Sequence, residues 1–376
     1  MQLPTAPPRE SLTEAAVVGL IRDAPAVEVA AGLELLDADL HVIDDVTDDF
    51  GGGSVARNGY ATLHGTAQLG VARTLDWGRA IVRPYMSMTD GTTTARFNLG
   101  AYVTSTPKRV IGQSPPMHAV AGYDILHTLA TPAGEAYAVD AGVGYLAAVE
   151  TILTNRGYVG YVIDQSAAAS MLPSSRVWPL DQGTTWLNIV NDLLGAVAYQ
   201  GIWSDWDGRL RVQRYLSPIA RAPEWYYDVD PVRSMLDSLR TVERDFFEAP
   251  NRWVAVRANN IDGPAPVEGD GIFTYVNQFV GDTSVEARGR IISKVVPLEA
   301  ADHAALVAAA QITIDADMRI PTKLSHATFP NPLHWHFDRL VLTDAELGPA
   351  ADVLSTQWTL PLNGANQTHE WMVLSQ

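Results

Sequence analysis

The stretch "GIWSDWDGRLRV", residues 201–212, could be a metal loop, a sugar-binding platform or a turn between two strands. Which of these it forms decides whether the middle of the chain is interpreted as a binding site or as a structural element. A calcium loop needs oxygen ligands at regular alternate positions ending in a glutamate, and this stretch stops after Asp205 and Asp207. What remains is Asp207-Gly208 between two strand-like segments, and Asp-Gly is a preferred two-residue hairpin pair. The sequence predicts a hairpin, with Trp203 packed against the preceding helix and Trp206 next to the turn.

Length, charge and cysteine content narrow the class of protein. The 376 residues, 47% of them hydrophobic, are enough for two or three globular domains. The formal net charge of -17 argues against a nucleic-acid binder, but not against a protein past which DNA slides without sticking. The absence of cysteine excludes disulfides, thiolate zinc sites and thiol nucleophiles. Without a signal-peptide pattern or an apolar run of membrane-spanning length, we expect a soluble protein made in a cytoplasm.

The order of predicted elements indicates an α+β, mainly β architecture in which an α/β domain is inserted between two β-rich parts. Asn58-Gly59 predicts a hairpin in the first part, and helices are expected at 144–157 and 184–201 in the insert. The expected division is an arm with a short helix at 1–26, a β domain at 27–118, the α/β domain at 119–215, and a second β domain at 216–376 with a helix near 298–317.

The segment "GVGYLA", residues 142–147, imitates a dinucleotide-binding fingerprint. Gly142 and Gly144 would admit a pyrophosphate, and Asp164 would hold the ribose about twenty residues later. However, the flanking chain offers no series of strand–helix–strand units. We therefore favour a plain strand-to-helix turn, and keep an enzyme using NAD, FAD or S-adenosylmethionine as a weaker alternative.

Three polar residues near the C-terminus could bind a metal. His334 and His336 are two apart in a predicted strand, so both would face one side, and Asp338 continues that face. A polar face on a half-exposed strand is the commoner explanation of such a pattern. The sequence holds neither an HExxH nor a GxSxG motif.

The ten tryptophans and thirteen tyrosines invite a carbohydrate-binding or carbohydrate-cleaving interpretation. The best local candidate is "EWYYDVD", residues 224–230, with Trp225 to Tyr227 as the stacking surface. Most aromatic residues fall within strand patterns, where packing in a core or interface is the simpler fate. A glycan-binding or glycan-cleaving protein that recognises a host cell wall remains the main alternative function.

The order of segments resembles the tail-hub proteins of tailed bacteriophages, especially the minor tail proteins of phages that infect actinobacteria. No single motif is catalytic or diagnostic, and the resemblance covers residues 27–376. The matching segments are "TLDWGRAIVRPYMSM", "ARFNLGAYVTSTP" with its LGxYxxxxP pattern, "GYDILHTL", "LLGAVAYQGIWSDWDGRLRVQRYLSP", "FFEAPNRWVAVRANN" and "PLHWHFDRLVLTD".

The resemblance implies a homotrimer in which each subunit contributes two small tube-like β-barrel domains around a central channel, with the α/β domain outside. Such a hub joins the six-fold tail tube, or a distal tail protein, to the three-fold tip, and the tape measure protein and DNA pass through it. Fibres or other minor tail proteins would dock below it.

The family further implies a structural protein of the virion tail tip, with no catalytic residue, cofactor, metal or membrane anchor. The chain lacks the C-terminal extension and lytic domain of larger relatives, so receptor binding is expected in other tip proteins. The residues expected to pack at turns and interfaces are Trp77, Tyr102, Trp203, Trp206, Asp207, Gly208 and Trp253.

Overall fold

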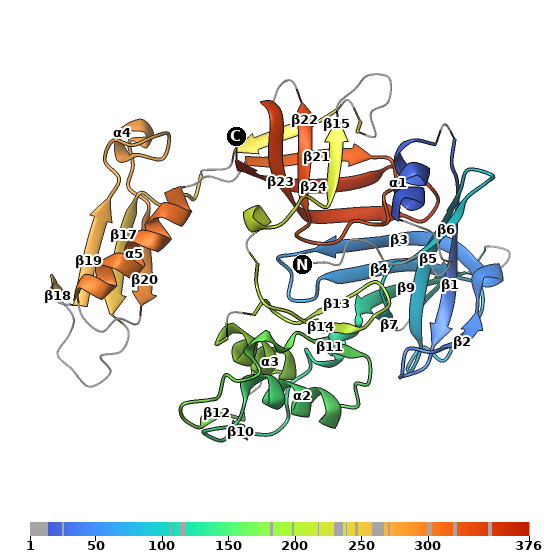
Figure 1. The fold of residues 1–376 in the computed structure, drawn as a ribbon, viewed down its shortest axis with the longest axis horizontal. Coiled ribbons are helices and arrows are strands. Elements are labelled where there is room, and N and C mark those ends of the chain that lie inside the picture. Colours follow the sequence, from blue (N-terminus) through green and yellow to red (C-terminus); the bar gives the residue numbers. More distant parts are fainter. Residues whose placement is uncertain are drawn as a thin grey trace. The chain divides into compact units, whose positions relative to one another are not determined.

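A computed structural model gives the fold of two compact units, Met1–Arg240 with Ser325–Gln376, and Thr241–Leu324. The chain is mainly β with few helices, as predicted (Figure 1). The expected proline-rich arm at 1–10 lies outside the described residues. The structure describes residues 14–24, 26–105, 107–110, 112, 117–180, 183–197, 199–216, 218–228, 236–237, 239–244, 247–257, 267–269, 271–298, 303–318, 322–344 and 348–375.

The N-terminal part of the larger unit forms a twisted antiparallel array in the order β3-β4-β9-β7-β5-β1-β2. Strand β4 alternates buried and exposed residues, as a strand with one face toward a core must. Helix α1 (Glu14–Arg22) precedes this array. The strands are β1 (Glu28–Leu36), β2 (Val42–Asp45), β3 (Phe50–Asn58), β4 (Gly65–Val71), β5 (Ile81–Thr89), β6 (Thr94–Asn98), β7 (Tyr102–Thr104), β8 (Lys108–Val110) and β9 (Met117–Asp124).

The last strands of the chain extend the same sheet. Strand β23 pairs antiparallel with β3, from Gln357 opposite Asn58 to Pro361 opposite Ser54. The two ends of the sequence are therefore joined edge to edge, as the blue and red strands in Figure 1 show. The strands are β15 (Trp225–Asp228), β21 (Thr322–Thr328), β22 (Arg339–Asp344), β23 (Gly348–Pro361) and β24 (Gln367–Ser375).

In the sequence, an α/β segment with its own apolar core comes between these two groups of strands. Its first helix lies within the expected range 144–157 and buries one apolar face, formed by Leu146, Val149, Ile152 and Leu153. The second helix begins after the N-cap Thr185 but ends at Gly195, earlier than expected. The elements are β10 (Tyr137–Val139), α2 (Tyr145–Asn155), β11 (Tyr161–Ile163), β12 (Arg176–Trp178), α3 (Trp186–Gly195), β13 (Trp203–Ser204) and β14 (Leu210–Val212).

The smaller unit is a sheet in the order β18-β19-β17-β20 with one long helix packed on it. Trp253 and Ala255 of the sheet pack against Leu306, Ala310 and Ile314 of that helix. The elements are β16 (Thr241–Arg244), β17 (Arg252–Arg257), β18 (Val267–Glu268), β19 (Gly271–Val276), α4 (Val285–Arg288), β20 (Ser293–Leu298) and α5 (His303–Met318).

Short 3-10 helices complete the described elements. They are η1 (Thr47–Asp49), η2 (Ile125–Thr128), η3 (Gln165–Ala167) and η4 (Pro218–Ala220). In the described part of the chain, no helix is long and apolar enough to span a bilayer.

Candidate functional site

Residues 201–212 form a hairpin, as predicted. Strands β13 and β14 pair antiparallel, with Trp203 opposite Arg211 and Ser204 opposite Leu210. The amide of Gly208 donates to the Asp205 carbonyl at 3.0 Å, so Trp206 and Asp207 are the central pair of the turn. Gly208 follows them at φ +88°, the left-handed position that a glycine occupies most easily.

The turn is thus displaced by one residue from the predicted Asp207-Gly208 pair. The side chain of Asp205 explains the displacement, because its Oδ1 accepts from the amides of Asp207 (3.0 Å) and Arg209 (2.9 Å). A type I turn followed by a glycine in the left-handed region is a common longer hairpin connection.

The tip of this hairpin packs directly on residues 98–102 of the first β part. The side-chain amide of Asn98 donates to Asp207 at 2.6 Å, and the Gly100 amide donates to the Trp206 carbonyl at 2.8 Å. A Cβ atom added to Gly208 would lie 2.3 Å from the Cβ of Ala101. Two segments more than a hundred residues apart therefore meet in backbone contact.

Tyr102 stabilises residues 98–102, the segment on which the hairpin packs. It is fully buried, and its hydroxyl donates to the Leu99 carbonyl at 2.8 Å. Burial raises the pKa of Tyr102, which keeps the phenol protonated as a donor. The LGxY segment is thus a closed turn against which the hairpin rests.

A buried ion pair lies beneath the hairpin. Arg57 donates to the Asp124 carboxylate at 3.1 Å and to the Ser204 carbonyl at 3.1 Å, and the Ser204 hydroxyl donates to Asp124 at 2.7 Å. The guanidinium also lies over the ring of Trp335, 3.5 Å from its centroid. Burial lowers the pKa of Arg57, and the Asp124 carboxylate opposes that shift.

A second ionic cluster flanks the turn. The Glu34 carboxylate accepts from Arg83 Nε at 2.8 Å and forms an ion pair with Arg96 at 2.6 Å. Arg83 also lies 3.9 Å from Asp207. Sequence reasoning missed both clusters, although charged residues at inward strand positions, such as Arg57 beside Val55, were a signal for them.

Five of the seven predicted packing residues belong to this junction, and all five are buried or half-buried. Trp203 packs edge-on against His336 at 5.7 Å, and Trp206 against Trp335 at 6.2 Å. The described core around α2 and α3 does not include Trp203, so the expected packing against the preceding helix is not seen. The five are Tyr102, Trp203, Trp206, Asp207 and Gly208.

The other two predicted residues lie elsewhere. Trp77 is half-buried beside His118, with ring centroids 5.7 Å apart, and its carbonyl accepts from Thr104. Trp253 is buried in the smaller unit, where its indole N–H donates to Asp317 at 2.8 Å.

The glycine segment at 142–144 is a strand-to-helix turn, as favoured. Gly142 adopts φ +82°, and Gly144 is the N-cap of α2. Strands β10 and β11 lie in different sheets, so the parallel strand–helix–strand unit of a dinucleotide site is missing here. Asp164 instead caps η3 by accepting from the Ser166 amide at 3.0 Å.

The expected strand through the histidines is wrong, because turns at 332–333 and 336–337 interrupt this segment and β22 begins only at Arg339. The Asp338 carboxylate accepts from the Trp335 amide at 2.7 Å, which folds the segment back on itself. His334 then bonds to the Tyr227 hydroxyl, whereas His336 stacks on His64 at 4.4 Å. The two imidazoles therefore have separate surroundings, and burial lowers the pKa of His334 to about 3.

The proposed sugar platform is not exposed. Trp225 and Tyr227 are buried, and Tyr227 packs against Trp371 at 5.1 Å. Only Tyr226, between them, faces solvent, as the alternation of a strand requires. Trp225 to Tyr227 therefore do not form the exposed stacking surface that the glycan-binding hypothesis requires.

Comparison with known proteins places the fold. No protein-family model and no curated protein matches the sequence. The tail protein from Neisseria meningitidis matches with a TM-score of 0.63 at 12% identity, over 92% of this chain and 96% of that chain. The 43 kDa tail protein of prophage MuSo2 from Shewanella oneidensis gives 0.61 at 10% identity, over 92% and 98%.

A chain of the Francisella PdpA–VgrG complex is also similar, with a TM-score of 0.55 at 9% identity, over 94% of this chain and 53% of that chain. The two tail proteins, by contrast, are matched over almost their whole length. The chain described here has the fold of phage tail proteins.

Proposed function

We propose that this chain is the structural tail-hub protein of a tailed phage, a component of the virion tail tip that joins the six-fold tube to a three-fold tip. The observation that carries the proposal is the match of 92% of the chain to two tail proteins over nearly their whole length. The order of segments in the sequence supports the same function independently. The actinobacterial host is proposed from that sequence resemblance alone.

The strand arrangement supports the mechanism of a symmetry adaptor. Strands from 27–118 and strands from the C-terminal part meet edge to edge through β3 and β23. We propose that these two groups are the tube-like barrel domains, and that three copies present six similar edges to the tail tube above. The α/β segment at 119–215 is then the outer insertion. A trimer would also pair or cover strand edges that a single copy leaves open.

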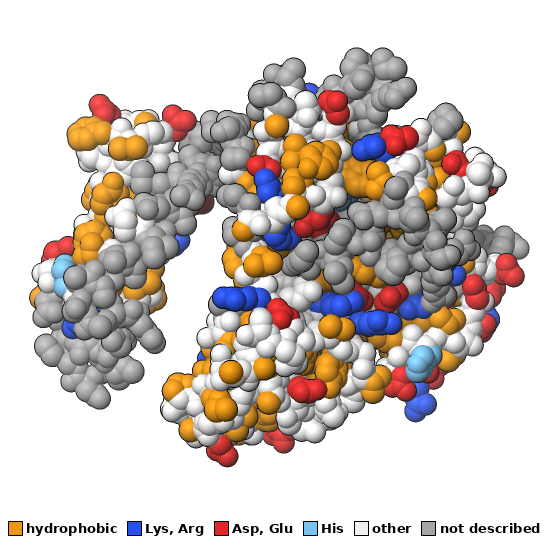
Figure 2. Space-filling view, in the orientation of Figure 1, with side chains coloured by type: hydrophobic (Ala, Val, Ile, Leu, Met, Phe, Trp, Pro, Cys, Tyr) orange, Lys and Arg blue, Asp and Glu red, His pale blue; other side chains and the backbone are white. Residues whose placement is uncertain are grey.

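The charge supports a lumen through which DNA moves. A net charge of -17 disfavours tight contact with phosphate, and Figure 2 shows acidic side chains scattered over the visible face. Lys and Arg side chains gather in that view in a strip near β13 and β14. We propose that tape measure protein and DNA pass the hub without specific binding, and that the protein is not an enzyme.

The test is the mass and symmetry of the purified protein in solution. We expect light scattering to give a stable species of three times the 40.7-kDa chain, and electron microscopy of that species to show a three-fold ring with a central channel. A chain that stays monomeric at all concentrations and also fails to form rings with its tail-tube protein would contradict the proposal.

A further inference from the structure

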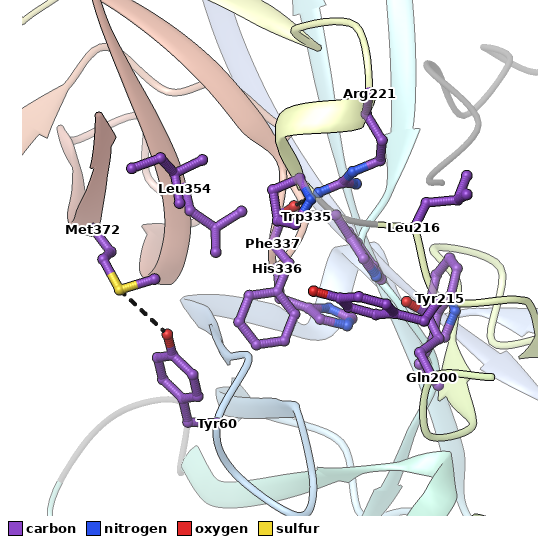
Figure 3. Close-up of a pocket in the computed structure, with 13 residues that line it drawn as sticks. Tyr60, Gln200, Tyr215, Leu216, Arg221, Trp335, His336, Phe337, Leu354 and Met372 are labelled. Atoms are coloured by element: carbon purple, nitrogen blue, oxygen red, sulfur yellow. Dashed lines mark hydrogen bonds between the residues drawn. The ribbon is translucent and has the colours of Figure 1, made fainter. Parts of the chain in front are cut away.

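A cavity of about 380 Å³ opens on the larger unit beside the hairpin junction, and it shares Trp203, Trp335 and His336 with that junction. This volume is within the range of pockets that hold small ligands or an anchoring side chain. Figure 3 shows side chains from three distant parts of the chain converging on it. The lining residues are Tyr60, Gln200, Trp203, Tyr215, Leu216, Pro218, Arg221, Trp335, His336, Phe337, Leu354, Met372 and Leu374.

The wall holds polar nitrogen atoms that bond to nothing in the described residues. The side chains that carry them are nine-tenths or more buried. A buried N–H without an acceptor is costly, so such groups normally meet a water or a ligand. The four atoms are Trp203 Nε1, Trp335 Nε1, Arg221 Nε and His336 Nδ1. The indole and guanidinium groups can only donate hydrogen bonds.

The rim is apolar and exposed. Tyr60, Tyr215 and Leu216 are 67%, 58% and 45% exposed. The hydroxyl of Tyr60 approaches the sulfur of Met372 at 3.8 Å across the mouth, as the dashed line in Figure 3 shows. Large apolar side chains at the edge of a concave site, with a flexible methionine among them, are typical of surfaces that bind other proteins.

The floor is held in a strained conformation. Phe337 adopts φ +62°, which is a rare backbone conformation for a bulky residue. Its amide donates to the Ser355 carbonyl at 2.6 Å, and its carbonyl accepts from Arg221. Strain of this kind is found at ligand-binding sites more often than elsewhere.

We infer that this pocket binds an extended peptide segment of a partner protein, with one large apolar side chain inserted and main-chain carbonyls accepting from Arg221 and the tryptophans. Tyrosine, tryptophan, phenylalanine, methionine and arginine are enriched at interface centres, and they make up seven of the thirteen lining residues. Sugar hydroxyls commonly donate hydrogen bonds to carboxylates, and no carboxylate is present among the described lining residues. The pocket therefore fits a peptide better than a sugar. The inference does not rest on the hub proposal.

The experiment selects short random linear peptides on the purified full chain and measures binding of an enriched peptide by fluorescence anisotropy. The pocket variants are Tyr215→Ala and Leu216→Asp, both at exposed rim positions where folding is preserved. The matched control is Tyr226→Ala, a tyrosine of similar exposure (61%) outside the pocket. We expect enriched peptides to share a large apolar residue, and their binding to weaken roughly tenfold or more in the pocket variants but not in the control.

Three results would overturn the inference: no peptide is enriched, enriched peptides bind both pocket variants as tightly as the wild type, or decanoate or a cell-wall oligosaccharide binds the pocket while peptides do not. Because the readout is binding to a single purified chain, its failure is separate from a failure to form trimers.

Discussion

Replacing Gly208 by alanine tests whether the hairpin tip rests on residues 98–102. Two costs add at this position. The backbone is at φ +88°, where an L-residue with a Cβ loses about 1–2 kcal/mol. The new Cβ would also lie 2.3 Å from that of Ala101, and overpacking of this kind costs about 1–3 kcal/mol. We therefore expect Gly208→Ala to lower the free energy of unfolding by about 2–5 kcal/mol.

Gly91 provides a matched control, because its φ is +87° and no atom lies within 4 Å of an added Cβ. Gly91→Ala should therefore show the backbone cost alone, about 1–2 kcal/mol. The assay is urea unfolding of both variants and the wild type, followed by tryptophan fluorescence. If the two variants lose the same stability, the close approach to Ala101 does not exist and the account of the junction is refuted.

Three further substitutions test other parts of the structure. Arg57→Met should cost about 3–5 kcal/mol in urea unfolding, because it leaves the buried Asp124 carboxylate unpaired, and a cost under 1 kcal/mol would show that the pair is not buried. Tyr102→Phe should cost about 1–3 kcal/mol by the same measurement, since the Leu99 carbonyl loses its donor; an unchanged midpoint would contradict that bond. Burial raises the pKa of Glu224 to about 7, from 4.5 in the unfolded chain. The protonated carboxyl therefore contributes to stability below pH 4.5, and this contribution is lost as the pH rises to about 7. Glu224→Gln should flatten the pH dependence of stability over this window and stabilise the protein at pH 8, and an identical pH profile for variant and wild type would contradict the burial of this carboxyl.

Local sequence patterns predicted the elements whose contacts are local. The inward positions of α2 follow from apolar residues spaced three and four apart, and each of these residues is buried. The β13–β14 hairpin was also predicted, because turn residues between two apolar segments suffice to specify it. In these cases the information needed lies within about twenty residues.

The failures came where a side chain competes with the backbone pattern. Alternation around His334 and His336 favoured a strand, but Asp338 accepts from the Trp335 amide and closes a turn instead. The hairpin was displaced for the same reason, since Asp205 accepts from two amides of the turn. Pairing of β23 with β3 depends on contacts across some three hundred residues, and no local pattern encodes it.

Three of the segments on which the sequence resemblance rested meet at the hairpin junction. "NLGAY" contacts "SDWDG" through Asn98 and Gly100, and "HWHFD" meets the same hairpin through the rings of Trp335 and His336. The three segments therefore pack on one another in space. A close backbone approach at Gly208 and ring packing at Trp335 and His336 restrict which residue types fit at these positions. At 10–12% identity to the two solved tail proteins, it is the fold and not the sequence identity that relates this chain to them.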